Sequence, residues 1–138
     1  MFSKKNKDFN EDYNLVKIAA LLVHTAKIDE NYSAKEEDII RQALLKIGAN
    51  NNNINEILRK GNEIENNSNQ ILEFTKEVKN MDEINRLKIV ETLWRIIYSN
   101  NEADIYEMSL MRRLGGLLYI DSKIMGDIKE RIKKEYST

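Results

Sequence analysis

The chain has 138 residues, of which 41% are hydrophobic and 33% charged, and its net charge is −1. This length and hydrophobic content fit one domain with a real core, whereas the near-neutral net charge gives no electrostatic footprint for nucleic acid, whose binding usually needs a basic face. The absence of cysteine excludes disulfides, thiolate metal sites and a thiol nucleophile.

The first residues, 1–9, are polar, and we expect them to form a flexible N-terminus ahead of a helical domain of residues 10–138. They lack the apolar core of a signal peptide. No apolar run reaches the roughly 20 residues that a membrane-spanning helix needs. We therefore expect a cytoplasmic protein without a transmembrane segment.

Apolar residues recur at helical spacing over 11–28, which predicts an amphipathic helix with one apolar face. An acidic loop follows. Ser33, with Glu36 three residues later, has the pattern of a capping box, in which the two side chains satisfy each other's backbone N–H groups. A second helix is therefore predicted to run to about Ile47, where Gly48 suits the left-handed position after its end.

Three helices are predicted in the middle of the chain, over about 54–65, 68–78 and 81–99. Gly61 is unfavourable inside the first of these. Ser68 is the predicted cap of the second, and Asn80 of the third. The third helix is the most apolar of the chain, and its apolar residues cover more than one stripe, so we place it centrally.

A second acidic loop comes next, and Asp104 with Glu107 repeats the capping-box pattern before a helix that extends to about Leu118. Asp121 or Ser122 begins a last helix that ends near Tyr136. No strand-like alternation occurs. The predicted fold class is all-α, a single domain of about seven helices.

The two acidic loops belong to a duplicated unit. Asp29 aligns with Asn100 and Glu36 with Glu107, and both pairs are separated by 71 residues (100 − 29 = 71) without a gap. We therefore expect two pseudo-symmetric halves, each built around a helix–acidic loop–helix unit.

The loop oxygens are of the kind that a hard divalent cation such as Ca²⁺ binds. The candidate metal ligands are Asp29, Asn31, Ser33, Glu36, Glu102, Asp104 and Glu107. The spacing is not that of an EF-hand, because Ala34 and Ile40 occupy the positions of its glycine and its last glutamate. In the alternative interpretation, which we favour, the Ser33/Glu36 and Asp104/Glu107 pairs only cap helices, because capping boxes are common and need no metal.

Other chemically suggestive residues have simpler explanations. His24 is the only histidine, and a single histidine with these neighbours builds neither a zinc site nor a catalytic triad. Trp94 and Tyr98 are four residues apart on one predicted helix, which favours packing against each other or the core.

The segments ALLVHTAKIDENYSAKEEDI (20–39) and FTKEVKNMDEINRLKIVETLWRIIYSNNEADIYEMSLMRRLGGLL (74–118) resemble the tellurite-resistance protein B (TerB) family, in its small single-domain bacterial branch. The resemblance covers roughly residues 15–136. It implies a TerB-like all-helical fold of two pseudo-symmetric halves and an association with tellurite resistance and stress responses. It also implies no established enzymatic activity, and metal binding by the loop carboxylates is a proposed property of the family. The chain departs from the family pattern at Glu30, where glycine is preferred, and at Asn100 and Asn101, which replace Asp-Gly.

We therefore expect a non-enzymatic interaction or sensing module for a stress response, with protein partners, no nucleic acid, and a divalent cation as the one cofactor considered. One alternative is a metal-dependent, hydrolase-like enzyme that uses the same loops, although the chain shows no ordered ligand set with a general base. The other is a protein–protein scaffold whose loops are purely structural. The oligomeric state is left open, and Tyr106, Tyr119 and Tyr136 are candidate interface residues if they are exposed.

Overall fold

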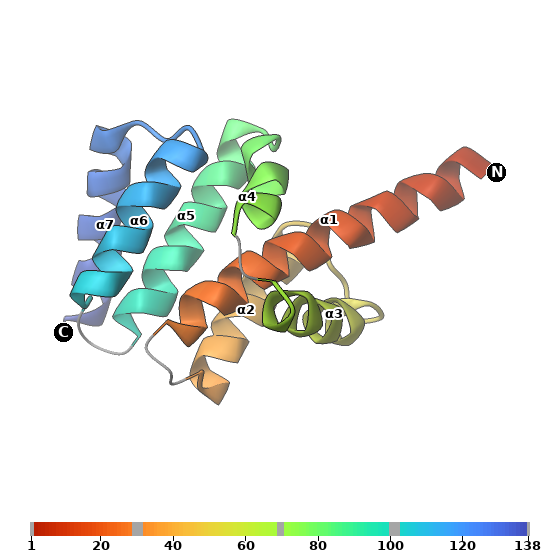
Figure 1. Cartoon of the computed structure of the whole chain (residues 1–138), viewed down its shortest axis with the longest axis horizontal. Coiled ribbons are helices and arrows are strands. Elements are labelled where there is room, and N and C mark those ends of the chain that lie inside the picture. Colours follow the sequence, from red (N-terminus) through yellow and green to blue (C-terminus); the bar gives the residue numbers. More distant parts are fainter. Residues whose placement is uncertain (1, 29–31, 69–70, 100–102, 138) are drawn as a thin grey trace.

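The computed structural model describes residues 2–28, 32–68, 71–99 and 103–137, and only the backbone for 2–11. Within these ranges every helix or strand is an α-helix, which confirms the predicted all-α class. The helices, shown in Figure 1, are α1 (Phe2–Lys27), α2 (Ala34–Lys46), α3 (Ile54–Asn66), α4 (Leu72–Lys79), α5 (Glu83–Tyr98), α6 (Ile105–Leu117) and α7 (Ser122–Tyr136).

The hydrophobic core is built around α1 and α5. The prediction that α5 lies centrally is confirmed, because it is buried on several sides and packs against α1, α2 and α7. The single apolar face predicted for α1 is wrong, since the whole run from Ile18 to Val23 is at most 3% exposed. The physical reason is that α2, α3, α4 and α5 all pack against α1, so its alanines and leucines are covered from every side.

The two halves share this core. The most extensive helix pairs are α1 with α3 and α5 with α7. Because α2 packs on α5 as well as on α1, the first half reaches across to the second. The free end of α1 extends away from the body of the molecule (Figure 1).

Two glycines are explained by the fold. A Cβ atom at Gly61 would lie 2.8 Å from the Cβ of Ala19 and 3.3 Å from the α1 backbone, so only glycine allows α3 to approach α1 this closely. Gly48 has a φ of +135°, which is the left-handed conformation predicted for the position after α2.

Three predicted helix starts are corrected by the structure. Helix α1 begins at Phe2 rather than near residue 11. The residues from Phe2 to residue 11 include no glycine or proline that would stop helix propagation. Helix α4 follows Ile71 without a side-chain cap, so Ser68 does not cap it. Helix α5 is capped by Asp82, which accepts a hydrogen bond from the Asn85 N–H at 2.9 Å, whereas Asn80 ends α4.

The structure shows the surroundings of the aromatic residues and of His24. Trp94 and Tyr98 stack with their ring centroids 5.9 Å apart, as predicted. His24 Nδ1 lies 3.4 Å from Glu65, which also pairs with Lys27 at 3.0 Å, so its nearest charged neighbour is a largely buried carboxylate at the edge of the core. Tyr106 and Tyr119 are 73% and 66% exposed, whereas Tyr136 is partly buried against the core.

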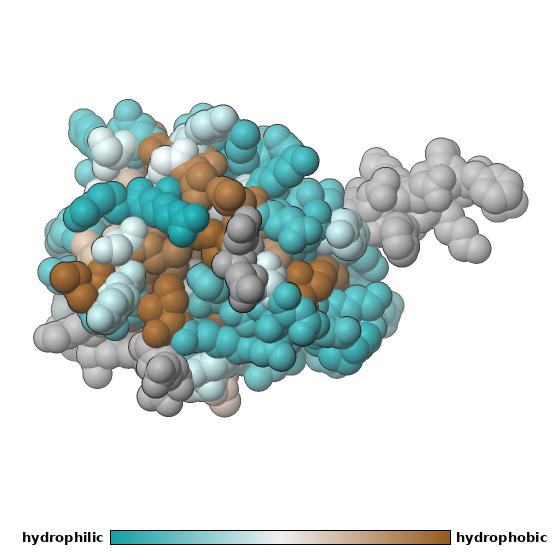
Figure 2. Space-filling model, viewed as in Figure 1, coloured by the Kyte–Doolittle hydropathy of each residue, from teal (hydrophilic) through white to brown (hydrophobic). Residues whose placement is uncertain are grey.

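The face of the molecule seen in Figure 2 is mainly hydrophilic, with separate apolar patches over α5 and α6. Ile105, at the start of α6, is 75% exposed. Among the described residues, no helix has the length and apolar character needed to cross a membrane.

Candidate functional site

Both acidic loops are closed by capping boxes, as the sequence predicts. At the start of α2, the Ser33 hydroxyl accepts a hydrogen bond from the Glu36 N–H at 3.2 Å, and Glu36 Oε1 accepts from the Ser33 N–H at 3.0 Å. At the start of α6, Asp104 accepts from the Glu107 N–H at 2.7 Å, and Glu107 Oε1 accepts from the Asp104 N–H at 3.1 Å. The two capping boxes therefore share the same pattern of hydrogen bonds.

The two capping glutamates are unusual in being buried. Glu36 is 1% exposed and Glu107 is 3% exposed. A carboxylate is costly to bury unless hydrogen bonds compensate for the lost water, and the backbone N–H groups of the two boxes supply part of that compensation. Each glutamate thus fixes the first turn of its helix against the core.

The two loops adjoin the same edge of the molecule. The C-terminal ends of α1 and α5 and the N-terminal ends of α2 and α6 lie together at the lower left of Figure 1. A direct link joins the two units, because the Lys35 ammonium donates a hydrogen bond to the Ser99 carbonyl at 3.2 Å. Nothing in the sequence signals this link, since its acceptor is a backbone group 64 residues away (99 − 35 = 64).

Four of the seven candidate metal ligands fall inside the described residues, namely Ser33, Glu36, Asp104 and Glu107. In both boxes Oε1 of the glutamate is engaged with the cap backbone, and the described ranges contain no group of three acidic or histidine side chains able to hold a metal ion. The remaining candidates, Asp29, Asn31 and Glu102, lie outside the described residues, as does Asn100. A cation site in the loops would depend on these residues for its ligands.

Tyr32 lies beside the first capping box and was not singled out by the sequence. Burial, together with the nearby negative charge of Glu37, raises the pKa of its hydroxyl to about 12. The hydroxyl therefore keeps its proton throughout the neutral and moderately alkaline range, and can serve only as a neutral hydrogen-bonding group.

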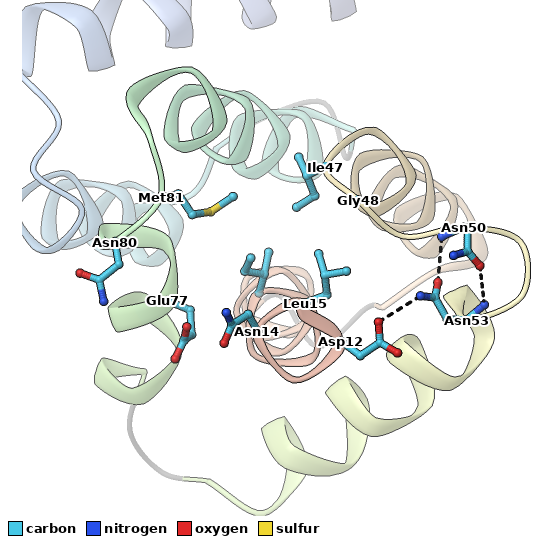
Figure 3. Close-up of a pocket in the computed structure, with 11 residues that line it drawn as sticks. Asp12, Asn14, Leu15, Ile47, Gly48, Asn50, Asn53, Glu77, Asn80 and Met81 are labelled. Atoms are coloured by element: carbon cyan, nitrogen blue, oxygen red, sulfur yellow. Dashed lines mark hydrogen bonds between the residues drawn. The ribbon is translucent and has the colours of Figure 1, made fainter. Parts of the chain in front are cut away.

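A cleft of about 690 Å³ lies elsewhere, between α1, the α2–α3 connection and the end of α4 (Figure 3). Leu15, Ile47 and Met81 converge on its interior. Its two carboxylates already have partners, because Asp12 accepts from the Asn53 amide at 3.1 Å and Glu77 pairs with Lys17 at 3.5 Å. The cleft is therefore lined by polar and apolar groups, and both of its carboxylates are already engaged with protein partners.

The asparagines at the rim of this cleft have a structural role. Asn50 and Asn53 bind each other's backbone N–H groups, at 2.8 and 3.1 Å (Figure 3). Asparagine side chains commonly build turns in this way. The run of asparagines at 50–53 is therefore an ordered turn between α2 and α3.

Comparison with known proteins adds one positive finding. The profile of the family described as "Tellurite resistance protein TerB" matches residues 15–130, which include both capping boxes and most of α7. No curated protein and no solved structure gives a significant match.

Proposed function

The chain belongs to the TerB family of tellurite resistance proteins, and from this premise we propose that it is a non-enzymatic interaction or sensing module of a stress response. The observation that carries the proposal is the pair of buried capping-box glutamates, Glu36 and Glu107, in the two copies of the loop unit. Two capping boxes whose side chains are fixed by hydrogen bonds suit a recognition role, because these polar groups are held in place before a ligand arrives.

We further propose that the two loops bind a divalent cation when their remaining oxygen ligands join those of the caps. Asp29, Asn31 and Glu102 are the residues that would complete such a site, with Asp104 at its edge. Carboxylate and amide oxygens suit Ca²⁺ or Mg²⁺, which bind oxygen ligands. The capping boxes would then serve as the frame of the site, and cation binding would be the event that is sensed.

The test is a calorimetric titration of chelator-treated protein with Ca²⁺, Mg²⁺, Mn²⁺ and Zn²⁺, repeated on Asp29→Ala and Asp104→Ala. Asp82→Ala is the matched control, because the Asp82 side chain accepts from the Asn85 N–H of α5 as the Asp104 side chain accepts from the Glu107 N–H of α6, but Asp82 lies outside the loops. The proposal expects heat that disappears in the two loop variants and persists in Asp82→Ala, with native circular dichroism throughout.

Absence of heat and of any change in melting temperature with all four ions would contradict the cation site. The loops would then have a purely structural role, and the module would be a protein–protein scaffold without a metal. The two complete capping boxes support this second candidate function.

A further inference from the structure

A groove of about 420 Å³ lies between α6 and α7, away from the acidic loops, and we call it the α6–α7 groove. Its interior is formed by Trp94 of α5, Met111 of α6 and Met125 of α7. Trp94 donates through its ring N–H to the Met125 sulfur at 3.3 Å. Methionine and tryptophan side chains together make an apolar, deformable floor of the kind that accommodates apolar side chains of a partner.

Glycines keep this groove open. The chain has five glycines, of which Gly48 and Gly61 are required by backbone conformation and packing, and the other three, Gly115, Gly116 and Gly126, line the groove. A Cβ atom at Gly116 or Gly126 would meet nothing within 4 Å. A Cβ atom at Gly115 would lie 3.1 Å from the Met125 methyl group. Since glycine lowers the stability of a helix and packing does not demand it at Gly116 or Gly126, its effect at these two positions is to leave space.

The internal duplication allows the glycines of the groove to be compared with the corresponding residues of the first half. Gly115 and Gly116 align with Leu44 and Leu45 of the first half, at the same separation of 71 residues (115 − 44 = 71). Leu44 is fully buried and Leu45 packs against the core. The second half therefore carries two glycines where the first half carries two large apolar side chains, on the helix that corresponds to α2.

The groove also has a positive rim. Its charged lining residues are Arg112 and Lys129, and no carboxylate lines it. Lys129 lies over the Trp94 ring, 5.9 Å from its centre. Within the described ranges, no carboxylate lies within ion-pair distance of either cation. Unpaired cations around an apolar floor are complementary to a partner that carries both apolar and acidic groups.

The apolar surface is longer than a small ligand needs. Ile105, Met108 and Arg112 are three and four residues apart, so they share one face of α6. Ile105 is 75% exposed, and from it to Gly116 the helix spans roughly 17 Å at 1.5 Å per residue. That length matches about three turns of a second helix laid along the groove.

We propose that the α6–α7 groove binds an amphipathic, acidic helix of a protein partner. Apolar residues at i, i+3, i+4 and i+7 enter between α6 and α7 against Trp94, and flanking carboxylates pair with Arg112 and Lys129. The inference deepens the proposed interaction role by naming the partner's chemistry. It does not involve the acidic loops, so failure of peptide binding and failure of the cation titration are separate results.

The probe is a fluorescein-labelled synthetic helix of about 14 residues, with leucines at i, i+3, i+4 and i+7 and glutamates on both flanks. Binding is measured by fluorescence anisotropy on the full chain. Trp94 provides a second readout, because it is the only tryptophan of the chain and lies in the groove. We expect saturable binding with a change in tryptophan emission, and loss of binding when the glutamates of the peptide are replaced by lysines.

Two variants locate the binding. Gly116→Leu restores the side chain found in the first half and should weaken peptide binding by about tenfold or more without lowering the melting temperature. Arg112→Glu should weaken it by a similar factor and reduce its salt dependence. Arg113→Glu is the matched control, because Arg113 is the exposed neighbour on α6 and does not line the groove, and its affinity should be nearly that of the wild type.

Equal binding by Gly116→Leu and the wild type would overturn the proposal, as would equal affinity for the acidic and basic peptides. The same experiments distinguish two other possible occupants of the groove, a second copy of the chain and a lipid surface. A dimer in sedimentation that Gly116→Leu dissociates, without peptide binding, would assign the groove to a second copy. Binding to phosphatidylglycerol vesicles but not to the peptide would assign it to a lipid surface. Either result replaces the helical partner.

Discussion

Lys35 on α2 donates a hydrogen bond to the carbonyl of Ser99, the residue that ends α5, at 3.2 Å. The bond satisfies one of the carbonyls left without a partner at the end of a helix, and it places a positive charge at the negative end of the α5 dipole. It thereby joins the segment after the first acidic loop to the segment before the second.

Replacing Lys35 by alanine should therefore destabilise the protein by about 0.5–1.5 kcal/mol, the usual net value of one hydrogen bond. Lys123→Ala is the matched control, because Lys123 is also the second residue of its helix and is also exposed. A lysine in a first turn opposes the helix dipole, so its removal from α7 should be neutral or slightly stabilising. Urea unfolding measures the free energy of unfolding of both variants. Equal changes would mean that the hydrogen bond from Lys35 to Ser99 does not stabilise the protein.

The capping boxes give a second prediction. Ser33→Ala and Asp104→Ala should each cost about 1 kcal/mol, because each leaves a helix N–H without its side-chain acceptor. Glu36→Ala should cost about 2–4 kcal/mol, since it removes a buried side chain and leaves the Ser33 N–H without its acceptor. The free energy of unfolding in urea tests this order. If Glu36→Ala lowered the free energy of unfolding no more than Ser33→Ala, the buried glutamate side chain would contribute nothing to stability beyond the cap.

The capping boxes and the middle of α5 could be predicted from the sequence because both depend on local rules, namely side-chain spacing and apolar density. The start of α4 at Leu72 could not, because Ser68 has the residue type of a helix cap, whereas α4 follows Ile71 without a side-chain cap. The close approach of Gly61 to Ala19 depends on how α3 crosses α1, which local spacing does not specify. The α6–α7 groove is hidden for the same reason, since it arises from the separation of two helices.

Substitution of two glycines by alanine tests whether packing requires glycine at each position. Gly61→Ala should destabilise the protein by about 1–3 kcal/mol, because the new Cβ would overlap Ala19 and the α1 backbone. Gly126→Ala should instead stabilise it by about 0.5–1 kcal/mol, because alanine is the better helix former and the space around the position is empty. Thermal unfolding monitored by circular dichroism distinguishes the two. Opposite signs are expected, and destabilisation by Gly126→Ala would show that α7 needs glycine there.

Tyr32 makes the stability of the protein depend on alkaline pH. Its pKa is about 12 in the folded protein, above the value of about 10 expected in the unfolded chain. Between these values the folded state keeps a proton that the unfolded state has lost, so the free energy of unfolding decreases as pH rises through this window and is unaffected below it. The slope from this one group is at most about 1.4 kcal/mol per pH unit.

Tyr32→Phe should remove that part of the pH dependence. Urea midpoints at pH 8, 9, 10 and 11 would show whether the wild type loses stability relative to Tyr32→Phe as the pH rises above about 10. Tyr106→Phe is the control, because Tyr106 is 73% exposed, and its curve should stay parallel to that of the wild type. Tyr98 and Tyr136, whose pKa values are also raised by burial, are present in both variants and cancel in the comparison. If the Tyr32→Phe curve were also parallel to the wild type, the folded protein would not hold the Tyr32 proton more tightly than the unfolded chain does.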